Sequence, residues 1–144
     1  MKRKFILAHM KVAEVYSELS SAKRLKVGAV IVKDDTIIGI GYNGMPSGWT
    51  NRCEDLTTPI EGDIPTLKTK PEVIHAESNA ISKVARSTNS TEGSYMFVTH
   101  APCLDCAKLI HQSGITRVFY KNVYRNDDGI NFLEKCGVKI LNIE

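Results

Sequence analysis

VGAVIVKDDTIIGI, at residues 27–40, predicts the hairpin around which the fold is built. Residues 27–32 are apolar and largely β-branched, a composition that favours a buried strand. Asp34 and Asp35 favour a turn, and residues 36–40 return to β-branched, apolar side chains. Two apolar runs separated by so short a turn indicate an antiparallel β-hairpin.

Helix and strand patterns alternate after this hairpin. Helices are predicted at residues 73–86, 103–112 and 129–135, and further strands at residues 95–99, 117–120 and 138–143. Before the hairpin, residues 3–19 predict an amphipathic helix. The apolar face expected for that helix consists of Phe5, Leu7, Ala8, Val12, Val15 and Leu19. This order of elements predicts an α/β fold of three α/β/α layers, with helices on both faces of a mixed five-stranded sheet.

Residues 45–72 differ from the rest of the chain, because they contain four prolines and show no sustained periodicity. We therefore predict a long loop there, and loops of that length in compact domains are usually functional or disordered. No repeat or linker divides the sequence, so we expect one domain over residues 1–144.

Composition excludes several classes of protein. The net charge of +3 permits an anionic substrate but is too small for a nucleic-acid-binding stripe, so no nucleic-acid partner is expected. No apolar run approaches the roughly 20 residues that a membrane helix needs. The basic N-terminus also lacks the apolar core of a signal peptide. We therefore expect a cytoplasmic protein without a membrane partner.

Two of the four cysteines, Cys103 and Cys106, form a C-x-x-C pattern. In a cytosolic protein this pattern is either a redox pair or half of a metal site. His75 upstream favours the metal. Cys136 is expected to be a small buried apolar residue, and Cys53 lies in the predicted loop with no second Cys or His nearby, so its role stays open.

The metal motif consists of His75-Ala76-Glu77 and the later Pro102-Cys103-Leu104-Asp105-Cys106. One imidazole and two thiolates leave the fourth tetrahedral position of a zinc ion open, as in catalytic sites. A structural zinc site would need a fourth ligand, for which His100 is the only close candidate. The spacing matches the H-x-E…P-C-x-x-C pattern of zinc-dependent base deaminases.

Glu77 gives this metal motif a catalytic character. It lies too close to His75 along the helix to be a second ligand, but it can carry protons next to the metal. Burial in a closed pocket is expected to raise its pKa, as a residue that both accepts and donates protons requires. The predicted reaction is hydrolytic deamination of a nucleobase.

The chain resembles the deoxycytidylate (dCMP) deaminases of the cytidine deaminase superfamily, from about Val27 to its C-terminus. The resemblance rests on VGAVIV (27–32), GYNGMPSG (41–48), HAESNAI (75–81) and PCLDCAK (102–108). The Gly-Tyr-Asn-Gly segment is typical of the dCMP branch, whereas the zinc motif is shared more widely. The resemblance implies a cytidine-deaminase-like fold and conversion of dCMP to dUMP and ammonia, which supplies dUMP for dTMP synthesis.

The same resemblance implies roles for individual residues. It assigns His75, Cys103 and Cys106 to one Zn²⁺ per subunit and Glu77 to proton transfer. It places Asn43 at the deoxyribose hydroxyl, the Ala76 amide at the base and Tyr124 near the phosphate. Some relatives hold a second, structural zinc near the predicted loop, but with only Cys53 present there that metal is not expected here.

The resemblance also implies regulation and assembly. Many members form homo-oligomers, commonly hexamers, that are activated by dCTP with Mg²⁺ and inhibited by dTTP. Candidate allosteric or phosphate-binding residues are Gly41, Tyr42, Gly44, Lys26 and Arg86. Further basic candidates for the phosphate are Arg24, Lys121 and Arg125.

Two other functions compete with this interpretation. A deaminase acting on tRNA or single-stranded DNA would need a basic groove with stacking aromatic residues, which a chain with 7% aromatic residues and one tryptophan, Trp49, does not suggest. A non-catalytic zinc module that binds nucleotides would have no need of Glu77.

Overall fold

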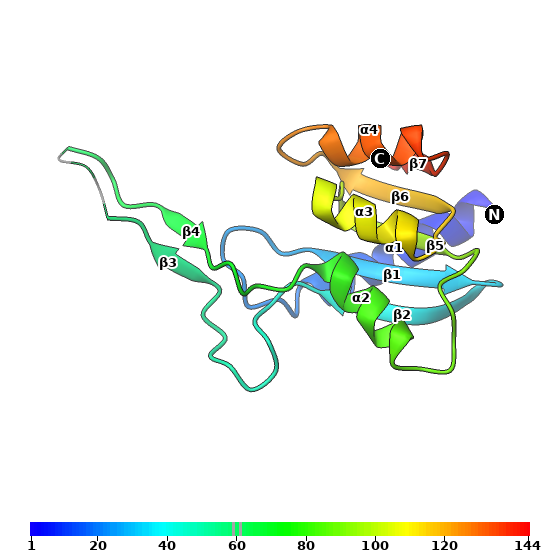
Figure 1. Cartoon of the computed structure of the whole chain (residues 1–144), viewed down its shortest axis with the longest axis horizontal. Coiled ribbons are helices and arrows are strands. Elements are labelled where there is room, and N and C mark those ends of the chain that lie inside the picture. Colours follow the sequence, from blue (N-terminus) through cyan, green and yellow to red (C-terminus); the bar gives the residue numbers. More distant parts are fainter. Residues whose placement is uncertain (59, 61) are drawn as a thin grey trace.

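The computed structural model describes residues 1–58, 60 and 62–144. These residues form a five-stranded sheet between helical layers and a separate two-stranded arm that extends from the body of the protein (Figure 1). The helices are α1 (Arg3–Ser17), α2 (Ala76–Ala85), α3 (Leu104–Gln112) and α4 (Asp128–Lys135). The main sheet contains β1 (Gly28–Lys33), β2 (Thr36–Tyr42), β5 (Tyr95–His100), β6 (Arg117–Asn122) and β7 (Lys139–Asn142).

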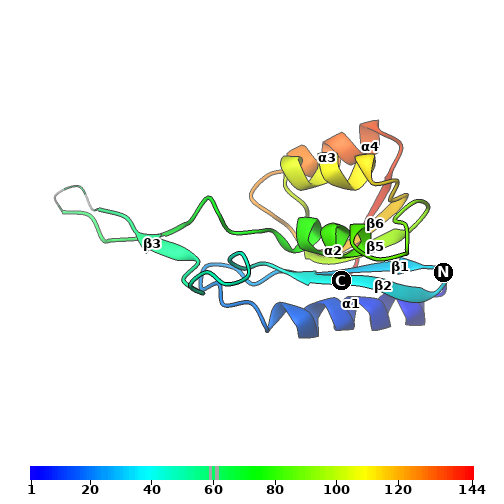
Figure 2. The same ribbon diagram turned by 60° about the horizontal axis from the view of Figure 1, so that its bottom comes forward.

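The main sheet has the strand order β2-β1-β5-β6-β7. Strand β1 pairs antiparallel with β2 and β5, whereas β5, β6 and β7 run parallel. Helix α1 covers one face and α2, α3 and α4 cover the other (Figure 2). The mixed sheet in a three-layer α/β/α arrangement confirms the predicted fold class.

The β1–β2 hairpin turns at the predicted aspartates. Asp34 and Asp35 have φ angles of 49° and 60°, so both lie in the left-handed region. Two successive left-handed residues are typical of a type I′ turn, whose twist matches that of the strands it joins. Aspartate tolerates this conformation better than most residues because its short side chain can hydrogen-bond locally.

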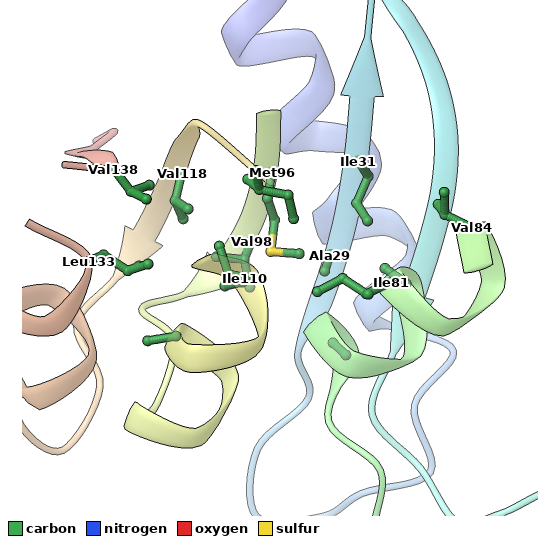
Figure 3. Close-up of a cluster of buried hydrophobic side chains, with 14 residues drawn as sticks. Ala29, Ile31, Ile81, Val84, Met96, Val98, Ile110, Val118, Leu133 and Val138 are labelled. Carbon is green, nitrogen blue, oxygen red and sulfur yellow. The ribbon is translucent and has the colours of Figure 1, made fainter. Parts of the chain in front are cut away.

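The hydrophobic core forms two clusters, one on each face of the sheet. The cluster beneath α2, α3 and α4 includes Ile31, Met96 and Ile110 (Figure 3). The cluster beneath α1 includes Met10 and Phe97, whose ring stacks on that of Phe119 at a centroid distance of 4.7 Å. Burial on both sides explains why the central strands are almost continuously apolar.

The predicted apolar face of α1 is partly wrong. Phe5, Val15 and Leu19 are 46%, 60% and 60% exposed, while Met10 and Ala13 are buried against the sheet. Helix α1 carries two neighbouring apolar stripes, each with helical spacing, and the sheet covers only one of them. Periodicity identifies the helix but cannot tell which of two such stripes faces the core.

The prediction of an unbroken loop at residues 45–72 is also wrong. Strands β3 (Glu54–Leu56) and β4 (Leu67–Thr69) pair antiparallel and form the arm seen in Figure 1. Three-residue strands are too short to produce a recognisable alternation of polar and apolar residues. Positions 59 and 61 of the predicted loop lie outside the described residues.

Gly41 lets β2 approach α2 closely. A Cβ atom at this position would collide with the Ala76 carbonyl and the Ala80 amide of that helix. We expect Gly41→Ala to destabilise the protein by about 1–3 kcal/mol, because backbone cannot move aside as a flexible side chain can. Urea unfolding measures this change.

Gly44→Ala provides the control, since no described atom lies within 4 Å of its Cβ position. Equal loss of stability in the two variants would show that close contact with α2 is not the cause.

Among the described residues, no helix combines the length and apolar character needed to cross a bilayer.

Candidate active site

The N-termini of α2 and α3 bring the metal motif together. His75 is the residue before α2 and Cys103 the residue before α3, and both have extended backbone conformations. Cys106 lies in the first turn of α3 and is buried. The His75 Nδ1 atom lies 3.3 Å from the Cys106 Sγ atom and 3.6 Å from the Cys103 Sγ atom.

These distances suit a single zinc ion. Zn–N and Zn–S bonds of ordinary length at a tetrahedral angle place nitrogen and sulfur about 3.6 Å apart. The ligand atoms of His75, Cys103 and Cys106 all lie within 4.8 Å of one another, and within the described ranges no fourth residue joins the group. His100 is therefore not a fourth ligand here, and the donor set is that of a site with an open position.

The two thiols differ sharply in acidity. Hydrogen bonds from Cys106 and His75 lower the pKa of Cys103 to about 4, because they stabilise its thiolate. The same hydrogen bond with Cys103, together with burial, raises the pKa of Cys106. Thiolates are the form in which cysteines bind metals, so a readily ionised Cys103 next to Cys106 is well suited to a divalent cation.

Glu77 occupies the first turn of α2 and is only 5% exposed. Burial raises its pKa because the charged carboxylate is poorly solvated there. The preceding residue, Ala76, is completely buried. A carboxyl group whose pKa is raised by burial, next to a zinc-binding group, suits a residue that both accepts and donates protons.

A cavity of about 670 Å³ opens over this centre. This volume is in the usual range for sites that bind small molecules. His75, Ala76, Glu77 and Cys103 are among the residues that line the cavity. Of the remaining predicted residues, Asn43, Tyr124, Arg24 and Arg125 also line it.

Asn43 combines a place in the cavity wall with a structural task. Its Oδ1 atom accepts a hydrogen bond from the Val27 amide at 2.9 Å, and its Nδ2 atom donates to the Leu25 carbonyl at 2.8 Å. One amide proton and one oxygen lone pair remain for a ligand. Asn43 therefore also holds the segment that leads into β1.

Several candidate residues are not among the described residues that line the cavity: Gly41, Tyr42, Gly44, Lys26, Arg86 and Lys121. The Tyr42 ring contacts the Lys83 ammonium group, and Gly44 exchanges backbone hydrogen bonds with Ile74. Arg86 is an exposed residue at the end of α2, and Lys121 forms an ion pair with Glu14.

Cys53, whose role the sequence left open, is buried beside Ser21 and does not belong to the metal group.

The sequence analysis missed four polar residues of the cavity wall, Glu54, Lys68, Thr69 and Asn122, and considered His100 only as a possible fourth metal ligand. Glu54 and Lys68 come from the arm, which was not expected to contain strands. His100 Nδ1 lies 2.9 Å from the Thr99 hydroxyl, and Asn122 Nδ2 donates to the Thr99 carbonyl at 2.9 Å. Of these residues, only His100 could have been connected with the site from the sequence, because it lies just before the P-C-x-x-C motif.

An α/β/α sandwich with a His-Cys-Cys metal group beside a buried glutamate defines a zinc-dependent deaminase. The family model described as the cytidine and deoxycytidylate deaminase zinc-binding region matches residues 3–122, and the chain belongs to this family.

Individual relatives agree with this assignment. The deoxycytidylate deaminase of Enterobacteria phage T4 is 36% identical over 93% of this chain and 87% of its own length. The human deoxycytidylate deaminase is 41% identical over 83% of this chain and 66% of its own. The dCMP deaminase of cyanophage S-TIM5, solved in complex with dCMP and dUMP, is 44% identical, covers 99% of both chains and superimposes with a TM-score of 0.88.

Proposed function

We propose that this protein hydrolyses dCMP to dUMP and ammonia, and that a single deaminase domain spans residues 1–144. The observation that carries the proposal is the buried Glu77 carboxyl group beside the His-Cys-Cys group in the wall of a cavity of about 670 Å³. The similarity to the cyanophage enzyme bound to dCMP and dUMP supports the choice of substrate.

His75, Cys103 and Cys106 would hold the zinc ion. When bound, zinc supplies a Lewis acid that makes water a stronger acid and nucleophile at neutral pH. The three residues also have a structural role, because their side chains meet between the start of α2 and the start of α3.

Glu77 moves the protons of the reaction. Its carboxylate takes a proton from the attacking water and delivers it to ring nitrogen N3, while the water oxygen forms a bond to C4. Glu77 then transfers the remaining proton of that oxygen to the exocyclic amine. The C4–N bond breaks, ammonia leaves, and the ring keeps the oxygen as the uracil carbonyl. The raised pKa of Glu77 suits both halves of this cycle.

Three further residues would orient the nucleotide. The Ala76 amide, at the start of α2, would hold the base near Glu77, and the free part of the Asn43 amide would bind the deoxyribose hydroxyl. Tyr124 would lie near the phosphate. All three line the same cavity as Glu77, which supports these assignments.

Regulation and assembly extend the proposal. We expect a cytoplasmic homo-oligomer, a hexamer by resemblance, that supplies dUMP for dTMP synthesis, with dCTP and Mg²⁺ as activator and dTTP as inhibitor. Gly41, Tyr42, Gly44, Lys26 and Arg86 stay as candidates for the effector or phosphate site. Close packing of Gly41 on α2 would let a change in the Gly-Tyr-Asn-Gly segment reach His75 and Glu77.

Ammonia release from purified, zinc-loaded protein tests this function. We expect dCMP to react faster than deoxycytidine, dCTP, single-stranded DNA or tRNA. Faster reaction of deoxycytidine would overturn the assignment to nucleotides, and faster reaction of tRNA or single-stranded DNA would favour a polynucleotide substrate.

The same assay tests regulation. The rate of ammonia release should depend sigmoidally on the dCMP concentration, and this dependence should become hyperbolic when dCTP and Mg²⁺ are added. A hyperbolic response without effector would show that this regulation is absent.

A further inference from the structure

His100 ends β5 and lies in the wall of the cavity, although it is not a metal ligand. Met96 and Val98, earlier in the same strand, belong to the core cluster beneath α2, α3 and α4 (Figure 3). Side chains alternate between the two faces of a strand, so His100 lies on the same face as these two residues, beyond the end of the cluster. That face is the one from which His75 and Glu77 also line the cavity.

Hydrogen bonds decide which ring nitrogen of His100 carries the proton. The Thr99 hydroxyl oxygen accepts a hydrogen bond from the Gly28 amide at 3.2 Å and lies 2.9 Å from His100 Nδ1. Thr99 is only 3% exposed, so its hydroxyl proton needs an acceptor, and Nδ1 is the acceptor that the described residues offer. Burial lowers the pKa of His100, which keeps the ring neutral at neutral pH. The single proton of the ring therefore lies on Nε2.

This Nε2–H group is available to a ligand in the cavity. No described residue forms a hydrogen bond with Nε2, and no buried side-chain nitrogen of the described residues lacks a partner, so Nε2 is accessible from the cavity. Asn122, at the end of β6, fixes the end of β5: its Nδ2 donates to the Thr99 carbonyl and its own carbonyl accepts from the Ala101 amide, both at 2.9 Å. His100 thus offers one uncharged donor from a well-supported part of the wall.

A pyrimidine base has one acceptor that the proposed reaction does not use. Glu77 acts at N3 and water attacks C4, which leaves the C2 carbonyl oxygen on the other side of N3. A carbonyl group suits an uncharged donor, whereas a phosphate favours a cation such as arginine. Adenine carries only hydrogen at C2, so it would leave the N–H group of His100 without a partner, and an unpaired donor in a binding site costs affinity.

We infer that the His100 Nε2–H group donates a hydrogen bond to the C2 carbonyl oxygen of the base, and that this contact selects pyrimidines over adenine. This inference rests on the proposed function. The hydrogen bond would orient the ring so that C4 faces the metal group and N3 faces Glu77. Thr99 would be a positioning residue, because its hydroxyl group sets the tautomer of His100.

Two substrates and two variants test this role of His100. In 2-thio-dCMP a sulfur atom, which is a weaker acceptor, replaces the C2 oxygen. We expect kcat/KM of the wild type to be about threefold to tenfold higher for dCMP than for 2-thio-dCMP. His100→Leu removes the donor and should lower kcat/KM for dCMP about tenfold, with the two substrates then within about twofold of each other. His100→Gln keeps an N–H donor at a similar distance from the backbone and should restore most of the preference.

His111→Leu is the matched control, since His111 is a half-buried histidine at the end of α3 that does not line the described cavity. Its kcat/KM for both substrates should stay within about twofold of the wild type. Zinc content, measured in every variant, should equal that of the wild type. Loss of zinc from both His100 variants would show that the residue is structural and would overturn the inference.

The remaining outcomes separate this inference from the proposed function. If the wild type deaminates dCMP and 2-thio-dCMP equally well, or if His100→Leu keeps the preference for dCMP, His100 does not bind the C2 oxygen and only this inference fails. If His100→Gln behaves like His100→Leu, the shape of the imidazole matters rather than its donor, and the inference is again wrong. If the wild type does not deaminate dCMP, the proposed function fails and this inference fails with it.

Discussion

Glu77→Gln is expected to lower kcat for dCMP by about 10²- to 10⁴-fold, the usual contribution of a general acid–base residue. Glutamine has nearly the same shape, but its amide cannot accept a proton from water and return it to the ring. Glu77 is not one of the metal ligands, so the variant should bind as much zinc as the wild type. Steady-state kinetics together with metal analysis measure both effects.

Glu72→Gln is the matched control, because Glu72 is an exposed carboxylate shortly before α2 and does not line the described cavity. It should keep activity within about twofold of the wild type. Near-normal activity of Glu77→Gln would show that another group carries the protons. Loss of zinc along with activity would point instead to a structural role for the carboxylate.

Cys106→Ala is expected to remove the zinc ion and with it all measurable activity. The Cys106 sulfur lies 3.3 Å from the His75 Nδ1 atom, so its loss leaves the ion with two protein ligands and a gap on the buried side. Structural and catalytic zinc sites depend on a full set of protein ligands, and binding energy at such sites contributes to folding. Metal content should fall from about one ion per chain to nearly none.

Cys136→Ala controls for the loss of a cysteine as such, since Cys136 packs beside the core and lies outside the metal group of the described residues. It should keep its zinc. A Cys106→Ala protein that retains a full complement of zinc would contradict the site. A wild-type protein in which Cys103 and Cys106 cycle between thiol and disulfide would support the alternative redox interpretation of C-x-x-C.

The arm changes how the cavity is understood. Its strands carry Glu54, which anchors the segment before β1, and Lys68, which adds a charge to the cavity wall. A substrate site built only from the motif residues would have a metal, a proton carrier and a place for the base. The arm adds polar and charged side chains to the wall of that cavity.

The chemistry could be predicted from sequence because it depends on local geometry. Cys103 and Cys106 lie three residues apart at the start of α3, and His75 and Glu77 lie two residues apart at the start of α2, so each pair is held together by the local geometry of one helix start. The hairpin at residues 27–40 and the alternation of elements likewise follow from local preferences, which explains why the fold class was predicted correctly.

Tertiary structure decided the features that involve residues distant in the chain. Which apolar stripe of α1 is buried, why Gly41 must lack a side chain, and how Arg24, Lys68 and Arg125 come to share one cavity all depend on contacts between separate elements. A lone surface cation has no local pattern, because its neighbours are assembled only when the chain folds. The sequence by itself thus determined the His-Cys-Cys group and the class of enzyme, whereas folding determined the cavity and the charged side chains that line it.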